Sequence, residues 1–213
     1  MLRAIFWDND GVLVDTERLY LQASREALTQ AGTTLSEAQY VAIVLGAGTS
    51  ILDLARQRGA GEAEITRLRG WRNTRYAELL ATESTACADV PGVLAALHGR
   101  YQMGIVTSSL REHFDIIHRR VGLLPFFDWV LLREDFTHTK PHPEPYLKAI
   151  ARSGCRADEC VVIEDTERGL TAARAAGLRC LIVPTHLTRG RPFAGATRVL
   201  SRLTDVPTAL AEL

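Results

Sequence analysis

The sequence predicts an α/β protein, in which a parallel sheet with helices on both faces is interrupted by an inserted helical domain. Three observations predict this fold class. Residues 4–7 and several later runs are apolar without alternation, which is typical of parallel strands buried on both faces. From residue 89 onward such runs alternate with helical patterns, which favours right-handed strand–helix–strand units. Residues 16–82 contain helical patterns and no convincing strand, and this stretch is too long for a single crossover.

The inserted stretch contains four predicted helical segments. Apolar residues recur at helical spacing from Leu19 onward, and Gly32 is a typical helix end. Ser36 is a typical N-cap for the second segment, which is interrupted at residues 46–49. The other two predicted helices span residues 50–58 and 62–80. The predicted domains are a core of residues 1–15 and 83–213 and an inserted domain of residues 16–82.

The rest of the chain alternates between predicted strands and predicted helices. After the strand at residues 4–7, the predicted strands span residues 103–106, 129–132, 160–163 and 180–183, and an edge strand is expected at 198–200. The predicted helices of this part span residues 93–98, 111–121, 143–153, 169–176 and 206–213.

Composition excludes several classes of protein. With 46% hydrophobic and 23% charged residues, the 213-residue chain has an ordinary globular composition. Lys plus Arg and Asp plus Glu number 25 each, so the zero net charge argues against a nucleic-acid partner. No apolar run approaches the roughly 18 residues of a membrane span, and the first strand leaves no room for a signal peptide. The four cysteines show no C-x-x-C pair, so we expect reduced thiols and a cytoplasmic protein.

Two acids mark the end of the first predicted strand. Asp8 and Asp10 follow the apolar run 4–7, and Gly11 comes next. Carboxylates this close repel each other unless a cation or a shared proton neutralises them, so the pair indicates a metal-dependent site. A calcium loop starting at Asp8 would need a glutamate at its twelfth position, where the chain has Leu19. That alternative is therefore disfavoured.

Two other predicted strands also end in polar residues. Parallel strands point the same way, so the residues that follow them meet at one edge of the sheet. The residues expected to meet Asp8 and Asp10 there are Thr107, Ser108, Glu164 and Asp165. An all-oxygen ligand set of this kind suits Mg²⁺, which takes one or two carboxylates together with substrate phosphate oxygens. Lys140, in a loop on the same edge, could bind phosphate or offset the carboxylate charge.

Each of these residues alone has an ordinary structural explanation. Thr107 or the pair Glu164 and Asp165 could simply cap a helix, and Lys140 could be a surface lysine. Only their joint placement at strand ends favours a functional site. The six histidines show no ligand spacing and are given no role, and the arginines of residues 62–80 are expected to form a solvent-exposed face.

The segments that carry these residues resemble, in order, the four motifs of the haloacid dehalogenase superfamily of phosphotransferases. Residues 8–15 (DNDGVLVD) resemble the first motif and residues 105–108 (IVTS) the second. Residues 140–145 (KPHPEP) resemble the third, and residues 162–166 (VIEDT) the fourth. The helical insertion after the first motif is similar to the cap of subfamily IA, which includes phosphoglycolate phosphatases and β-phosphoglucomutases. The resemblance implies a Rossmann-like core and a helical-bundle cap.

The resemblance also implies the chemistry. Asp8 corresponds to the nucleophile that becomes an aspartyl-phosphate, and Asp10 to the acid that protonates the leaving oxygen and then activates water. The residues implied in holding Mg²⁺ are Asp8, Asp10 through its backbone carbonyl, Glu164 and Asp165. The residues implied in holding the phosphoryl oxygens are Thr107, Ser108 and Lys140.

The cap loop bears on the substrate. In the mutases this loop carries a lysine and an arginine that bind a second phosphate, and the corresponding positions here are Leu45 and Thr49. Gly46 and Thr49 of this loop are expected to contact substrate instead. The loop thus weakens the mutase interpretation, whereas Glu164 followed by Asp165 resembles the sugar-phosphate branch.

The sequence therefore predicts a Mg²⁺-dependent phosphatase of small phosphorylated metabolites, either sugar phosphates or phosphoglycolate. We expect a monomer or a weak dimer that binds neither nucleic acid nor membrane. A hexose phosphate mutase is the first alternative, with Arg72 or Arg75 as the missing cation of the cap. A receiver-type phosphoacceptor module is the second, although such modules have no helical insertion after their first acids.

Overall fold

The computed structural model describes residues 1–213 and contains one six-stranded sheet. All its strand pairs are parallel, and the order across the sheet is β3-β2-β1-β4-β5-β6. The strands are β1 (Ala4–Trp7), β2 (Gln102–Val106), β3 (Trp129–Leu131), β4 (Cys160–Glu164), β5 (Arg179–Ile182) and β6 (Arg198–Val199). The predicted fold class is confirmed.

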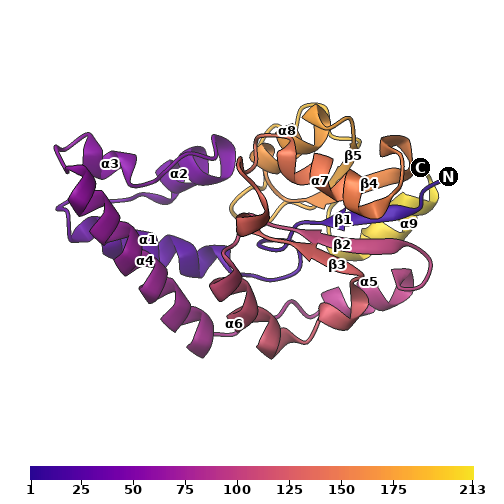
Figure 1. Cartoon of the computed structure of the whole chain (residues 1–213), viewed down its shortest axis with the longest axis horizontal. Coiled ribbons are helices and arrows are strands. Elements are labelled where there is room, and N and C mark those ends of the chain that lie inside the picture. The colour runs from indigo at the N-terminus through magenta and orange to yellow at the C-terminus, as the bar shows by residue number, and fades with distance from the viewer.

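Helices cover both faces of this sheet (Figure 1). On one face lie α7 (Glu144–Ser153) and α8 (Glu167–Ala175); on the other lie α5 (Val90–Leu97), α6 (Arg111–Val121) and α9 (Val206–Ala211). Strand β1 contributes Ala4 and Phe6 to the 18-residue apolar cluster under α7 and α8. Its Ile5 and Trp7 belong to the 28-residue cluster on the opposite face. Because every side chain of the strand is buried, its sequence shows no apolar–polar alternation.

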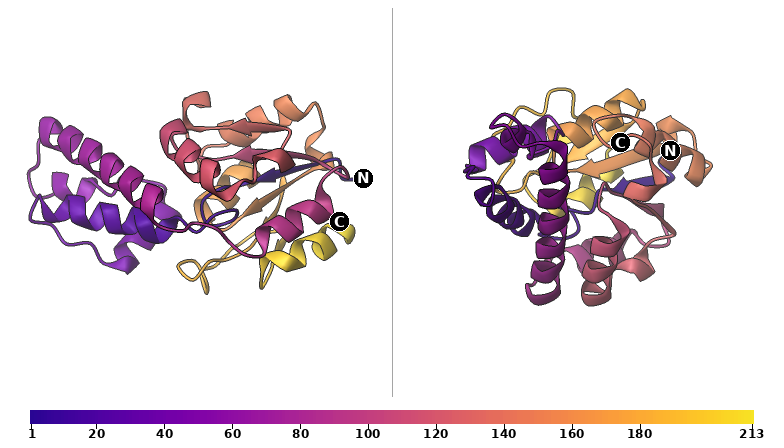
Figure 2. Two further views of the ribbon diagram at one scale, coloured as in Figure 1. Left: turned by 90° about the horizontal axis from the view of Figure 1, so that it is seen from below. Right: turned by 60° about the vertical axis from the view of Figure 1, so that its left-hand side comes forward.

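The helices of the insertion lie together at one end of the sheet (Figures 1 and 2). They are α1 (Glu17–Thr29), α2 (Glu37–Tyr40), the π-helical turn η1 (Val41–Gly46), α3 (Asp53–Arg56) and α4 (Glu62–Thr82). Helices α1 and α4 pack side by side, and 11 of the 12 residues of a buried apolar cluster come from these helices and their connections; the twelfth, Leu187, comes from the core. This arrangement supports our proposed division at residues 16–82, and we call this part the cap.

Some element boundaries differ from those predicted. Ser36 caps α2 as predicted, in a capping box with Gln39, but the helix continues as the π-turn η1. Within residues 50–58 only α3 is helical. Ile51 and Leu52 lie in a turn before it, and their side chains are buried in the apolar cluster of the cap. Helix α5 starts three residues earlier than predicted, since Pro91 is accommodated in its first turn. None of the helices has the length and apolar character required to cross a bilayer.

Candidate active site

The candidate site lies at the carboxyl ends of the three central strands. Strand β1 lies between β2 and β4, with Trp7 in register with both Ile105 and Ile163. The residue after Trp7, Asp8, is therefore level with the ends of both neighbouring strands. Strands β2 and β3 lie on one side of β1, and the strands that follow in the chain, from β4 on, lie on the other side. The direction of the strand order thus reverses at β1, and ligands of α/β proteins bind at such a switch point.

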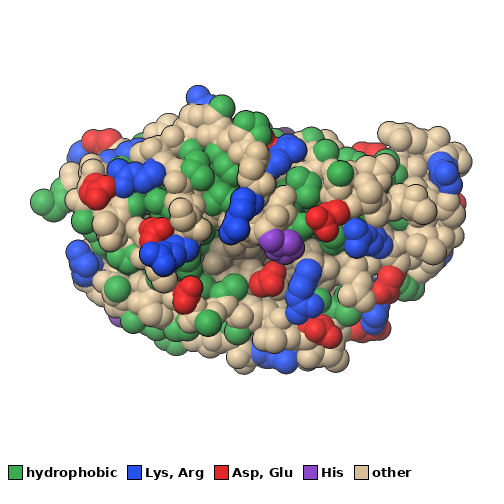
Figure 3. All heavy atoms as spheres, turned by 180° about the vertical axis from the view of Figure 1, so that it is seen from behind, with side chains coloured by type: hydrophobic (Ala, Val, Ile, Leu, Met, Phe, Trp, Pro, Cys, Tyr) green, Lys and Arg blue, Asp and Glu red, His purple; other side chains and the backbone are tan.

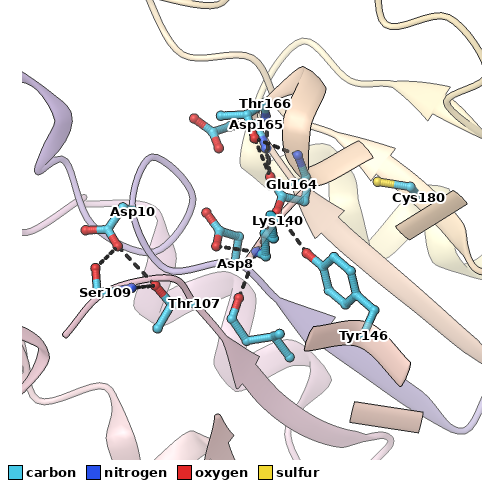
Figure 4. Close-up of polar contacts among 12 residues, drawn as sticks. Asp8, Asp10, Thr107, Ser109, Lys140, Tyr146, Glu164, Asp165, Thr166 and Cys180 are labelled. Atoms are coloured by element: carbon cyan, nitrogen blue, oxygen red, sulfur yellow. Dashed lines mark hydrogen bonds and ion pairs between the residues drawn. The ribbon is translucent and has the colours of Figure 1, made fainter. Parts of the chain in front are cut away.

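Lys140 connects the acids of two of these strands (Figure 4). Its Nζ donates to Asp8 Oδ1 at 2.7 Å, to Glu164 Oε1 at 2.6 Å and to the Val106 carbonyl at 2.8 Å. An ammonium group has three hydrogens, so all of them are engaged. The lysine is only 2% exposed and does not line the cavity described below. Two roles were considered for Lys140 from the sequence. In this geometry the lysine compensates the charge of Asp8 and Glu164, and its contact with a phosphate stays a prediction.

Burial shapes the protonation of the three acids. Burial, followed by the charge of Glu164, raises the pKa of Asp8 to about 7, although Lys140 acts in the opposite direction. Burial also favours the neutral form of Glu164, but Lys140 and Tyr146 outweigh it and hold its pKa below the ordinary value. The Tyr146 hydroxyl donates to Glu164 at 2.8 Å. Burial and the two neighbouring carboxylates raise the pKa of Asp165 well above its ordinary value. The single positive charge of Lys140 therefore does not compensate the negative charge of the three carboxylates.

The same acids form a group that fits a metal ion. Oxygen atoms of Asp8, Glu164 and Asp165 lie within 4.8 Å of one another. Both carboxylate oxygens of Asp165 are buried and have no hydrogen-bond partner in the protein, which suits a carboxylate that binds a cation. Gly11 makes room for this carboxylate, since a Cβ at that position would lie 2.1 Å from Asp165 Oδ2. An all-oxygen donor set suits Mg²⁺.

Asp10 lies apart from that group and is held by hydroxyls. Its carboxylate accepts hydrogen bonds from Thr16 at 2.5 Å, Ser109 at 2.6 Å and Thr107 at 3.2 Å. The predicted contact of Asp10 with a metal involves its backbone carbonyl and stays a prediction. The hydroxyl of Ser108 is buried without a partner, so it is available to a substrate oxygen. Ser109 was missed from the sequence, although the run of three hydroxyl residues after β2 was the available signal.

A cavity of about 440 Å³ joins this site to the cap. Its core side includes Asp8, Asp10, Thr107 and Ser108, four of the predicted site residues. Seen from behind, the surface is hollowed near the middle of the molecule, and Lys and Arg side chains lie around the hollow (Figure 3). The volume is within the range of small-molecule sites. The structure thus brings the predicted catalytic acids and hydroxyls together at the wall of this cavity.

The cap contributes basic and aromatic residues to the cavity. Arg69 and Arg72 of α4 both line it. Arg69 is exposed, as expected for the arginines of this helix, whereas Arg72 is half-buried, so the expected solvent-exposed face is found only in part. Arg72 lies over the ring of Tyr20, 4.9 Å from its centroid. A helical wheel cannot show this, because the face of α4 that turns to the core is set by how the cap docks. Arg75, by contrast, pairs with Glu26 at 2.8 Å and does not line the cavity.

The cap loop contacts the core and not the cavity. Neither Gly46 nor Thr49 lines the cavity, and Thr49 is exposed, so the substrate contacts predicted for these two residues stay predictions. Gly48 instead lies against the Lys140–Pro141 peptide, and a Cβ there would be 2.9 Å from Pro141 Cδ and 3.2 Å from the Lys140 carbonyl. Its φ of +67° also requires glycine. The loop thus closes the cap onto the core.

Three of the histidines that were given no role from the sequence, His113, His138 and His142, make polar contacts or lie close to other possible ligands in the structure. His113 lines the cavity and donates a hydrogen bond from Nε2 to the Asn73 carbonyl at 3.2 Å, which links α6 to α4. His138, His142 and Glu144 bring possible ligand atoms within 4.8 Å of one another at the surface. The Glu144 carboxylate already accepts two backbone hydrogen bonds there.

The family model of haloacid dehalogenase-like hydrolases matches residues 5–183. The chain belongs to this family. The recognition made from the sequence is therefore confirmed, as is the prediction that the protein is a hydrolase. Protein CbbY of Rhodobacter capsulatus is 28% identical over 209 residues, which cover 92% of this chain and 91% of that protein. Hexitol phosphatase B of Escherichia coli (strain K12) is 29% identical over 216 residues, covering 97% and 94%.

A solved structure also resembles the whole chain. The crystal structure of a mutant of CbbY from Rhodobacter sphaeroides in complex with xylulose-(1,5)bisphosphate superimposes with a TM-score of 0.82 over 96% of each chain. Its sequence identity is 23%, so this likeness establishes the fold alone. It covers the core and the cap together.

Proposed function

We propose that the protein is a Mg²⁺-dependent phosphatase that hydrolyses small phosphorylated metabolites through an aspartyl-phosphate intermediate on Asp8. The observation that carries the proposal is the surroundings of Asp8. One of its oxygens is fixed by Lys140 at 2.7 Å, and the residue borders the cavity between core and cap, beside two further acids. A carboxylate held in this way has one oxygen left to attack a phosphorus atom.

Asp10 would act as the acid and the base, and its place beside Asp8 at the cavity wall supports this role. In the first step an oxygen of Asp8 bonds to phosphorus, the ester bond breaks, and Asp10 gives a proton to the leaving oxygen. In the second step Asp10 takes a proton from water, which attacks the phosphoryl group, releases inorganic phosphate and restores the Asp8 carboxylate. Three hydroxyls surround Asp10, and because hydroxyls both donate and accept, they can hold it in either state.

The remaining residues hold the phosphoryl group. Asp8, Glu164 and Asp165 would hold Mg²⁺, which would supply positive charge for the phosphoryl oxygens. The unpartnered hydroxyl of Ser108, at the cavity wall, would donate to one of the other oxygens. Thr107 would donate to another once its hydroxyl turns from Asp10 to the substrate. The closed cap would exclude bulk water from the reaction.

Sugar phosphates are the first substrate class to test. The names of the two relatives, a hexitol phosphatase and a CbbY protein whose counterpart was crystallised with a sugar bisphosphate, support this choice. Phosphoglycolate is the second class, as expected from the subfamily. A hexose phosphate mutase stays an alternative. Its cap needs a cation for the second phosphate, the cap loop has none, and Arg72 of α4 lines the cavity and could supply it. The receiver-type alternative is set aside, because the chain is a hydrolase of this family with an inserted cap.

The deciding experiment measures phosphate release with Mg²⁺ from a panel of sugar phosphates, phosphoglycolate and nucleotides. Glucose 1-phosphate with its bisphosphate is assayed in parallel for glucose 6-phosphate, which only a mutase would form. Asp8→Asn should lower phosphate release at least about a thousandfold, because the amide is not nucleophilic. Asp15→Asn, at an exposed position of the same motif, is the matched control. Residual wild-type activity in Asp8→Asn would refute the proposed nucleophile.

A further inference from the structure

Arg168 lies where the cap meets the core and has no role in the chemistry described above. It stands in the first turn of α8, and its side chain borders the cavity. The other arginines of the cavity wall have other surroundings: Arg69 is exposed, Arg72 is held by Asn73, and Arg133 donates to a carbonyl at 2.8 Å. Arg168 is the partly buried arginine of this wall without a partner.

The guanidinium of Arg168 makes no hydrogen bond and no ion pair with the protein. Its Nε is fully buried and unpartnered, and none of its other nitrogens lies within 4.0 Å of a carboxylate oxygen. Buried N–H donors in proteins are nearly always paired. A planar group with five donors, left without an acceptor at the wall of a cavity, is suited to an oxyanion of a ligand.

The charge of Arg168 is maintained by its surroundings. Burial lowers its pKa, but the carboxylates of Glu17, Asp8 and Glu164 outweigh burial and keep the pKa above its ordinary value. Glu17 raises the pKa of Arg168 the most of the three, and its carboxylate also accepts a hydrogen bond from the Tyr40 hydroxyl. The arginine is therefore a permanent cation in the cavity wall, while all three hydrogens of Lys140 are already engaged.

Its position separates Arg168 from the phosphoryl hydroxyls. Thr107 and Ser108 follow β2, on one side of Asp8, whereas Arg168 follows β4, on the other side. The Cδ of Arg168 lies 3.5 Å from the point that a Cβ of Gly48 would occupy, so the cap loop packs on its stem. The arginine is thus next to the cap and not next to the hydroxyls.

We propose that Arg168 is a specificity-determining residue that binds a second oxyanion of the substrate, a carboxylate or a further phosphate, when the cap is closed. This inference rests on the proposed phosphatase activity. A substrate with only one phosphate leaves the guanidinium without an acceptor, whereas a doubly anionic one satisfies it. Gly48 takes part indirectly, because a Cβ at that position would lie 2.9 Å from Pro141 Cδ and would displace the loop that packs on the arginine stem.

The test uses two pairs of substrates that differ in the second anion. 3-Phosphoglycerate with glycerol 3-phosphate tests a carboxylate, and fructose 1,6-bisphosphate with fructose 1-phosphate tests a second phosphate. Arg168→Gln should lower kcat/KM for the doubly anionic member of one pair by at least about tenfold, mainly through KM. The singly anionic member should change less than about twofold. Arg168→Lys should retain part of the preference, and the exposed Arg152→Gln on α7 should retain all of it.

Binding separates this inference from the proposed function. Calorimetry on Asp8→Asn, with and without Arg168→Gln, measures the affinity for the same compounds in the absence of turnover. No phosphate release by the wild-type protein would refute the function, whereas equal affinity of the two variants for both members of both pairs would refute the role of Arg168. An equal loss of kcat/KM on singly and doubly anionic substrates would also overturn it.

Discussion

The ammonium of Lys140 lies 2.7 Å from one carboxylate oxygen of Asp8, and this ion pair is almost completely buried. The same ammonium lies 2.6 Å from Glu164, whose side chain has no exposed area. One lysine thus holds the ends of β1 and β4 together at the site where we place the reaction. Such a pair is costly to break, because removal of one partner leaves an uncompensated charge in the interior.

Substitution of Lys140 should therefore affect stability as well as activity. Lys140→Met should lower the free energy of unfolding by about 3–5 kcal/mol, because Asp8 and Glu164 lose their counter-ion. Urea unfolding measures this change. The chain has one other lysine, Lys148, which pairs at the surface with Glu144 at 3.0 Å. Lys148→Met should cost about 1 kcal/mol or less, as exposed pairs do. Equal effects of the two substitutions would contradict the assignment of a structural ion pair.

Magnesium should stabilise the protein through Asp165. Its two carboxylate oxygens are buried without partners, so a bound cation relieves their repulsion with Asp8 and Glu164. At a Mg²⁺ concentration of 100 times the dissociation constant, stability should rise by about 2.7 kcal/mol, measured as a higher melting temperature. EDTA should reverse the shift and stop phosphate release.

Asp165→Asn is the matched variant for this experiment. It removes one charge from the acidic group while retaining the shape of the side chain, so the Mg²⁺-dependent shift should be largely lost. Asp158→Asn, whose carboxylate is exposed and pairs with Arg156 at 3.0 Å, should keep the full shift. A metal response that is unchanged in Asp165→Asn would exclude this carboxylate as a ligand.

Ser109 should act as a positioning residue for Asp10. Its hydroxyl donates to the Asp10 carboxylate at 2.6 Å. Ser109→Ala removes this contact and should lower kcat by roughly tenfold with little change in KM, since a hydrogen bond to a charged group is worth about 1.5–3 kcal/mol. The pH profile of kcat should shift as well, which a merely structural role would not produce. Ser201→Ala, at an exposed position, provides the comparison.

The stability of the protein should fall in mild acid because of His118. Its ring is 4% exposed and donates from Nε2 to Asn9 Oδ1 at 2.8 Å. Burial lowers the pKa of His118 from 6.5 to about 4. Between these values the unfolded chain binds a proton that the folded chain does not, so the free energy of unfolding decreases as the pH falls from 6.5 to 4. The full effect of this shift is about 3 kcal/mol.

Comparison of two proteins isolates this contribution. Urea unfolding of the wild type and of His118→Gln, measured from pH 7 to pH 4.5, should give curves that diverge as the pH falls. Glutamine cannot take up a proton in this range and retains an N–H donor for Asn9. Parallel curves for the two proteins would show that His118 does not contribute to acid sensitivity.

Much of the site could be predicted because strand ends are local features of the sequence. An apolar run followed by an acid or a hydroxyl identified Asp8, Thr107 and Glu164, and parallel strands bring such residues to one edge. The cap loop could not be predicted in the same way. Whether Gly46 or Thr49 reaches the cavity depends on how the cap docks, and the docking is a contact between segments more than 90 residues apart, as Gly48 against Pro141 shows.

The sequence by itself determined the sheet, the helical insertion and the family, because apolar periodicity and four short motifs depend only on neighbouring residues. Only the tertiary structure decided what each charge does. It engaged all three hydrogens of Lys140, turned Arg72 into the cavity and left Arg168 without a partner. The physical reason is that a charged side chain acts on whatever lies within a few ångströms, and those neighbours come from distant parts of the chain.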